Sequence, residues 1–144
     1  MKVQTILAKK GTNVVTIRPE ESIKEATRLL VEYNIGALVV VNEARQPVGI
    51  ISERDILRAA ARRDDAFARP VSQVMTKDVI IGLPQDDIIS VAHTMTERRF
   101  RHLPIMEKGE LIGIISIGDV VKAQRDQYQG EMYTLQTQII EDQS

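Results

Sequence analysis

The sequence contains no cysteine and no tryptophan. The absence of cysteine excludes disulfide bonds, thiol nucleophiles and cysteine-ligated zinc, and it fits a reducing compartment. Only three tyrosines and two phenylalanines are present among 144 residues, which leaves little aromatic surface for stacking against bases. The 19 Lys and Arg residues are balanced by 20 Asp and Glu residues, for a formal net charge of −1. We therefore expect no nucleic-acid partner, because a dedicated nucleic-acid binder is normally more basic.

Long hydrophobic runs are also lacking. The longest stretch without a polar side chain extends from Ile35 to Val41, far below the ~20 residues of a membrane-spanning helix. The apolar run that precedes Lys9 and Lys10 is too short for the hydrophobic region of a secretory signal. We expect a cytoplasmic protein with no membrane partner. Its 43% hydrophobic residues suffice for the core of one domain or of two small fused halves.

An internal repeat determines the expected architecture. Pro19 and Ile23 match Pro84 and Ile88 at an offset of 65 residues. Further along, residues 49–52 (Gly-Ile-Ile-Ser) match residues 113–116, and Asp55 matches Asp119, at an offset of 64. The slip of one residue falls in polar stretches, where loops tolerate changes of length. The chain is therefore a tandem duplication of a unit of roughly 60 residues, a size that is marginally stable in isolation.

Both copies show the same order of expected elements. A short β-branched strand is followed by a helix with apolar residues at helical spacing, then by two apolar strands and a last helix. The Ser22-x-x-Glu25 pattern predicts a capping box at the start of the first of these helices, and Asp86-Asp87 marks the start of its counterpart. The expected ranges are leader helices at 3–9 and 71–77, strands at 14–17, 37–41, 48–51, 79–81, 103–106 and 111–115, and apolar helix positions Ile23, Ala26, Leu30, Tyr33, Ile88, Val91, Ala92 and Met95.

The expected fold class is therefore α/β (α+β), with two pseudo-symmetric β-α-β-β-α repeats packed sheet to sheet and an extended C-terminal helix. We divide the chain into residues 1–69 (first repeat with leader helix and linker), 70–124 (second repeat) and 125–144 (helical tail). The tail carries an apolar stripe that predicts a partner surface or packing onto its own module, although Gly130 interrupts it. The stripe consists of Val121, Tyr128, Met132, Leu135 and Ile139.

The repeated Gly-Ile-Ile-Ser-x-x-Asp pattern is the motif with most chemical content. It comprises Ile50, Ser52 and Asp55 in the first copy and Ile114, Ser116 and Asp119 in the second. One interpretation is helix capping alone, with Ser as the N-cap residue and Asp three positions later. The other is a nucleotide site, because a helix N-terminus offers N–H groups to an anion and a carboxylate accepts hydrogen bonds from a ribose diol. The two interpretations are compatible.

A basic segment, residues 98–104, leads into a strand of the second copy. Arg101 and His102 stand at the mouth of that strand and either contact phosphate or belong to a solvated helix end. Arg54 either reaches a phosphate or forms a surface ion pair. His93 lies off the apolar stripe of its helix and is expected to be exposed. We expect no metal site, because Asp86-Asp87 has no histidine or third carboxylate at ligand spacing.

The chain resembles a stand-alone tandem pair of cystathionine-β-synthase (CBS) domains, a Bateman module. Four segments carry the resemblance, residues 34–41, 49–55, 99–105 and 113–121, and together the copies cover about residues 3–123. The resemblance implies a non-catalytic sensory or regulatory module and a flat homodimer acting on an unidentified protein partner. It implies an adenosine ligand (AMP, ADP, ATP, NAD or S-adenosylmethionine) between the copies, and no obligatory cofactor. CBS pairs regulate larger enzymes such as IMP dehydrogenase, so catalysis is not inferred.

The resemblance also implies roles for individual residues. Asp55 and Asp119 resemble ribose-binding carboxylates, with Ser52 and Ser116 as nearby hydroxyls. Residues resembling the walls and backbone edges of adenine sites are Ile50, Ile114, Ala37, Leu38 and Leu103, with Thr16 and Ile23 on the facing first strand. Arg101 and His102 resemble phosphate contacts. Because the second copy has Gly82 where the first has Ile17, and the first lacks a cation at Gly36, we expect the Asp119 site to be occupied first. The alternative is a purely structural dimerising protein.

Overall fold

The computed structural model describes the backbone of residues 1–143 and the side chains of residues 1–132. The two predicted repeats are present, and each is preceded by a leader segment. The first has the predicted order β-α-β-β-α, whereas the second has an isolated bridge at Gly82 in place of its first strand. The elements are α1 (Val3–Lys10), β1 (Thr16–Ile17), α2 (Ile23–Tyr33), β2 (Ala37–Val41), β3 (Pro47–Ser52), α3 (Glu53–Arg62), the 3₁₀ turns η1 (Ala66–Ala68) and η2 (Val71–Gln73), α4 (Ile88–Arg98), β4 (His102–Glu107), β5 (Glu110–Ser116) and α5 (Ile117–Gln143).

The helices begin where their capping residues stand. Ser22 Oγ accepts a hydrogen bond from the Glu25 N–H (3.1 Å), and Asp87 accepts from the N–H groups of the first turn of α4. The predicted capping box at α2 is only half formed, because the Glu25 carboxylate is bound by Arg28. A complete capping box joins Ser52 and Asp55 at the start of α3. The predicted cap positions therefore set the starts of α2, α3, α4 and α5, whereas α1 begins without a side-chain cap.

The two sheets differ in size. In the first repeat, β1 pairs in parallel with β2, which pairs in antiparallel with β3, whereas β4 and β5 form a two-stranded sheet. The strand predicted at 79–81 is wrong: only Gly82 bridges to β4, through the N–H that it donates to the Pro104 carbonyl (2.9 Å). A Cβ at Gly82 would lie 2.7 Å from Leu103 Cδ2, so this close approach requires glycine. Pro84, with no N–H to donate, follows shortly after and prevents extension of the pairing.

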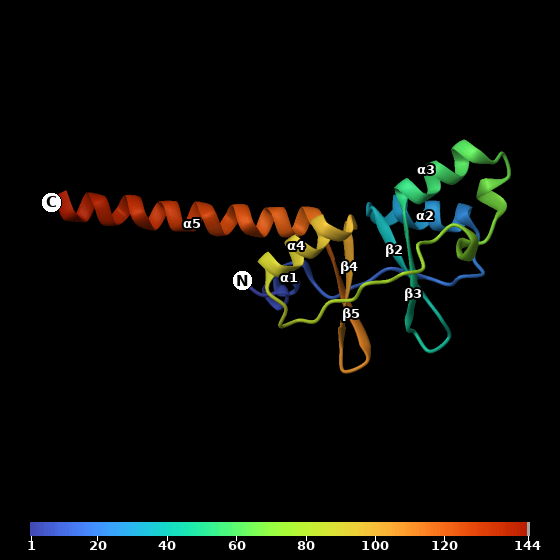
Figure 1. Ribbon diagram of the computed structural model, residues 1–144, viewed down its shortest axis with the longest axis horizontal. Helices are drawn as coiled ribbons and strands as arrows, with labels where there is room; N and C mark the ends of the chain where they lie inside the picture. Colours follow the sequence, from blue (N-terminus) through green and yellow to red (C-terminus); the bar gives the residue numbers. More distant parts are fainter. Residues whose placement is uncertain (144) are drawn as a thin grey trace.

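The sheets pack against each other through a small apolar cluster. Val39 and Val41 of β2 meet Met106 of β4 and Leu111 of β5 there. Separate cores fill the space between each sheet and its own helices. Figure 1 shows the two hairpins side by side, with α2 and α3 beside the first and α4 beside the second. Since β2 is covered on both faces, all five of its residues are buried.

Each leader segment packs on the other repeat, not on the one that directly follows it in sequence. Val3, Ile6 and Leu7 of α1 belong to the core of the second repeat, where the Val3 N–H donates to the Asp86 carbonyl (2.9 Å). Val71, within the second leader, lies instead in the core of the first repeat. The helix predicted over residues 71–77 is wrong, because only the 3₁₀ turn Val71–Gln73 forms there. This crossing brings the end of α1 to the edge of β5.

The last helix, α5, projects beyond the body of the molecule (Figure 1). Its buried residues, Val120 and Ala123, lie in its first two turns, whereas Tyr128 is 63% exposed. The helix continues through Gly130, where we expected an interruption. Leu135 and Ile139 of the predicted stripe lie outside the residues whose side chains are described. Among the described residues, no helix has both the length and the apolar character needed to cross a membrane.

Candidate ligand site between the repeats

A cavity of about 570 Å³ lies between the two repeats; we call it the inter-repeat cavity. It brings together Asp55 and Ser52 of the first repeat with Arg101 and His102 of the second. Its volume is within the range of small-molecule sites in proteins, which is roughly 300–1,000 Å³. The remaining lining residues are Gly36, Ile50, Glu53, Arg54, Arg58, Thr76, Asp78, Val79, Ile80, Arg98, Arg99, Phe100 and Ile117.

Asp55 caps α3 with only one of its two carboxylate oxygens. Asp55 Oδ2 accepts hydrogen bonds from the Ser52 N–H (2.9 Å) and the Ser52 hydroxyl (3.0 Å). Within the described part of the chain, Oδ1 accepts no hydrogen bond. The capping and ligand interpretations are thus compatible at this residue, because Oδ1 can accept from a ligand hydroxyl while Oδ2 holds the helix start.

Asp119 occupies the equivalent position in the second repeat but has a different neighbour. Asp119 Oδ2 accepts from the Ser116 N–H (2.8 Å) and also from Lys10 Nζ (2.6 Å). The same ammonium donates to the Ile114 carbonyl (2.9 Å). One cation from the end of α1 therefore binds both the carboxylate and the strand edge that we expected a nucleoside to use. The residue equivalent to Lys10 in the second leader is Asp78, because Leu7 lies against Gly113 as Met75 lies against Gly49.

The electrostatics of Asp119 follow from this contact. Burial alone would raise the pKa of the Asp119 carboxyl, but the Lys10 hydrogen bond, the backbone hydrogen bond from Ser116 and the charge of Lys10 together hold it below its usual value. Asp119 is therefore ionised and paired near neutral pH. This arrangement differs from our expectation that the Asp119 site is occupied first, since the expected phosphate contacts Arg101 and His102 line the cavity of Asp55.

The backbone edge of Ile50 is not open to a ligand. The Ile50 N–H donates to the Thr76 carbonyl (3.0 Å), and the Thr76 N–H donates to the Ile50 carbonyl (2.8 Å). Ile50 nonetheless lines the inter-repeat cavity and contributes an apolar wall. At Ile50, a ligand thus meets the side chain rather than the strand edge.

The other predicted adenine walls belong to the scaffold. The side chains of Leu38 and Ile23 are fully buried, Leu103 is 4% exposed, and Ala37 is also buried. Thr16 is half-buried and pairs with Val39 in the sheet. None of these five is among the residues that line the inter-repeat cavity. Their role is to hold β1, β2 and β4 in place behind the site.

Positive charge is concentrated on the inter-repeat cavity. Its lining contains five arginines, Arg54, Arg58, Arg98, Arg99 and Arg101, against three carboxylates. Burial lowers the pKa of His102 and the charge of Lys10 lowers it further, whereas Glu53 and Asp119 act in the opposite direction. His102 is therefore a neutral hydrogen-bonding group near pH 7, not the cation that the sequence suggests. Guanidinium groups are well suited to phosphate because they form paired, charge-assisted hydrogen bonds.

Sequence reasoning missed one wall of the site. Thr76, Asp78, Val79 and Ile80 come from the segment that joins the repeats, where we expected a helix over 71–77 and a strand over 79–81. Lys10 is the counterpart of Asp78 in the first leader, so alignment of the two leaders is the signal that could have drawn attention to both segments. His93 is exposed, as expected. Among the described residues, no group of three or more histidines and carboxylates could hold a metal ion.

Comparison with protein-family models gives two matches to the CBS domain, over residues 8–62 and 71–126. The chain belongs to the CBS-domain family. A curated relative, an uncharacterized 17.7 kDa protein of Acidianus ambivalens, is 42% identical over 117 residues, which are 80% of this chain and 70% of that protein. The tandem CBS architecture that the resemblance implied is therefore confirmed.

Solved structures of CBS-domain proteins share the fold. The CBS-domain containing protein ATU1752 from Agrobacterium tumefaciens superposes with a TM-score of 0.83 and 42% identity, over 86% of this chain and 99% of that one. A CBS-domain protein of Pyrobaculum aerophilum, solved in complex with AMP, has a TM-score of 0.74 and 30% identity, over 83% of this chain and 89% of that one. The CBS pair of MJ0100, solved with 5′-methylthioadenosine and S-adenosyl-L-methionine, has a TM-score of 0.79 and 26% identity, over 88% of this chain and 98% of that one.

Proposed function

We propose that this protein is a non-catalytic regulatory module that binds an adenine nucleotide in the inter-repeat cavity and acts on a protein partner. The observation that carries the proposal is Oδ1 of Asp55, a carboxylate oxygen that receives no hydrogen bond from the described residues and lies in a cavity lined by five arginines. Two CBS-pair structures with this fold contain adenosine compounds, AMP in one and S-adenosyl-L-methionine with 5′-methylthioadenosine in the other.

The proposed ligand pose follows from the chemistry of the lining. The ribose diol donates to Asp55 Oδ1, close to the Ser52 hydroxyl. The adenine ring lies against the apolar side chains of Ile50, Val79 and Ile80. The phosphates lie toward Arg54, Arg101 and His102. Five lining arginines exceed the needs of one phosphate, so ADP, ATP and NAD are candidate ligands beside AMP.

The matched test compares Asp55→Ala with Asp119→Ala in an AMP titration by calorimetry. Both variants remove the acid of a Ser-x-x-Asp helix start, at a cost of about 0.5–2 kcal/mol of stability. Only Asp55 faces the inter-repeat cavity, so Asp55→Ala weakens AMP binding roughly ten- to a hundredfold, because hydrogen bonds to a charged group contribute about 1.5–3 kcal/mol. Asp119→Ala leaves AMP affinity unchanged. Equal affinities in the two variants would contradict the proposed site.

A purely structural dimerisation module is the second candidate, and one observation favours it. The helices α2, α3, α4 and α5 each expose a large apolar side chain, Val31 (76%), Leu57 (68%), Ile89 (69%) and Val121 (56%). Such side chains fit a homodimer interface, which the nucleotide-binding proposal also includes. Light scattering is expected to show a dimer for the wild type. The double variant Leu57→Glu/Val121→Glu is expected to be a monomer.

A panel of thermal melts separates the two candidates. A ligand at 100 times its dissociation constant stabilises the folded state by about 2.7 kcal/mol, which raises the melting temperature by several degrees for a chain of this size. Melting temperatures that stay constant in millimolar AMP, ADP, ATP, NAD and S-adenosylmethionine would leave only the structural candidate.

A further inference from the structure

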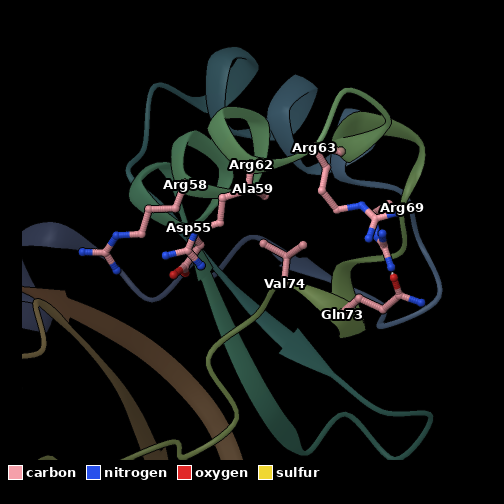
Figure 2. A pocket seen from close by; sticks show the side chains of 9 residues that line it. Asp55, Arg58, Ala59, Arg62, Arg63, Arg69, Gln73 and Val74 are labelled. Carbon is pink, nitrogen blue, oxygen red and sulfur yellow. The ribbon is translucent and has the colours of Figure 1, made fainter.

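A second cavity, of about 380 Å³, is lined by α3, including Asp55, and by the segment that follows it. We call it the arginine pocket, after Arg58, Arg62, Arg63 and Arg69, which line it. Figure 2 shows Arg58 and Arg62 on α3, with Arg63 and Arg69 near the connection that leads to η2. Ala59, Ala66 and Val74 provide its apolar surface.

The charge of the arginine pocket is poorly compensated. Asp55 is the one carboxylate among its lining residues, and its Oδ2 is engaged at the start of α3. Arg63 Nε forms an ion pair with the Asp65 carboxylate (3.0 Å), which compensates part of the charge, and Arg69 Nε donates to Gln73 (2.7 Å). Both side chains are thereby held in place, and among the described residues no hydrogen bond engages their terminal nitrogens. The side chains of Arg58 and Arg62 form no hydrogen bond or ion pair with any residue that the structure describes.

A helix C-terminus explains part of this charge but not all of it. Arg62 is in the last turn of α3, where a cation interacts favourably with the helix dipole. Arg58 lies one turn earlier, and Arg69 comes from a different element, the end of η1. Four arginines, three from the end of α3 and one from the end of η1, line one concave surface in a chain of net charge −1, an arrangement suited to an anion that carries several charges.

We propose that the arginine pocket binds a linear polyphosphate group. Guanidinium forks bind phosphate oxygens in pairs, and four of them match a chain of successive phosphates better than a single one. The pocket adjoins the inter-repeat cavity, because Asp55 and Arg58 line both. The polyphosphate is therefore either a free anion or the phosphate chain of a nucleotide seated in the neighbouring cavity.

Calorimetric titration with inorganic tripolyphosphate tests the proposal on the full chain. The double variant Arg62→Ala/Arg69→Ala removes two arginines that line only the arginine pocket. Its matched control, Arg45→Ala/Arg125→Ala, removes two exposed arginines that line neither cavity. We expect tripolyphosphate binding to weaken roughly tenfold or more in the first variant and to stay at the wild-type value in the control. Equal affinities in the two variants, or no binding to the wild type, would overturn the proposal.

Nucleotide titrations of the same variants identify the source of the phosphates. If the chain of a bound nucleotide enters the arginine pocket, Arg62→Ala/Arg69→Ala weakens ATP binding but leaves AMP binding intact. If the pocket takes a free polyphosphate, both nucleotides bind the variant normally, and tripolyphosphate binds the wild type in the presence of saturating AMP. If saturating AMP abolishes tripolyphosphate binding to the wild type, the anion binds in the inter-repeat cavity, and the proposal is contradicted.

Discussion

Two aspartates with the same local role differ in what surrounds them. Asp55 and Asp119 both receive the N–H of the serine that begins their helix. Their surroundings differ because Lys10, 109 positions from Asp119 in sequence, reaches across from α1. Sequence reasoning found both carboxylates from the repeat, since the Ser-x-x-Asp pattern is local. It could not find Lys10, because that contact depends on how α1 packs on the second repeat.

Removal of Lys10 is expected to open the second site. In Lys10→Ala, Asp119 and the Ile114 carbonyl lose the ammonium that binds them, so AMP binding changes from one to two molecules per chain. Because Lys10 is 37% exposed and Asp119 25%, the ion pair contributes no more than about 1 kcal/mol to stability. Calorimetric stoichiometry checks the prediction, with the neighbouring exposed Lys9→Ala as control. A stoichiometry of one in both variants would show that Lys10 is not what closes this site.

His102 makes the stability of the free protein dependent on pH. Burial and the charge of Lys10 lower its pKa in the folded state, so at pH values below its ordinary pKa of about 6.5 the unfolded chain binds a proton that the folded chain does not. Stability is thus present above that pKa and is lost as the pH falls. Melting temperatures between about pH 7.5 and pH 5.5 span this range. They are expected to fall less in His102→Gln than in the wild type or in the exposed-site control His93→Gln.

At the scale of elements, both wrong predictions, the helix at 71–77 and the strand at 79–81, fall in the segment that joins the repeats. The helix starts at Ile23, Glu53, Ile88 and Ile117 follow directly from their capping residues and apolar spacing. The strand predicted at 79–81 failed because pairing there is a matter of tertiary contact: Gly82 makes the single bridge to β4. Val79 and Ile80 line the inter-repeat cavity instead. A short β-branched run does not by itself indicate whether it will pair.

Gly49 links the fold of the first repeat to the wall of its site. A Cβ at this position would lie against the Met75 sulfur and 3.0 Å from the Thr76 carbonyl oxygen, which accepts from Ile50. Gly49→Ala is therefore expected to lower the free energy of unfolding by about 1–3 kcal/mol through overpacking, and to weaken AMP binding by displacing Thr76. Chemical denaturation and calorimetry measure the two effects.

Gly130→Ala is the matched control for this substitution. A Cβ at Gly130 has open space around it, and the residue lies within α5. Alanine favours a helix interior over glycine by about 0.5–1 kcal/mol. This variant is expected to keep or raise the stability of the wild type and to bind AMP normally. A Gly49→Ala protein as stable as Gly130→Ala would show that the Met75–Thr76 contact is not tight.

At the scale of the whole molecule, the two repeats share their fold but not the chemistry of their sites. The duplication, the order of elements and the contact between the two sheets could all be predicted from the offset of 64–65 residues. The difference between the two sites could not, because it arises where the leaders cross to different repeats. Lys10 reaches one site, and the Thr76 segment lines the other. One open cavity with one cation-closed counterpart is the organisation on which the proposed function rests.

A crystal structure of the protein grown with AMP tests that organisation most directly. We expect the nucleotide in the inter-repeat cavity, with a ribose hydroxyl bonded to Asp55 Oδ1, the phosphate beside Arg101, and Lys10 still paired with Asp119. AMP bound at Asp119 with Lys10 displaced, while Asp55 faces solvent alone, would contradict the account.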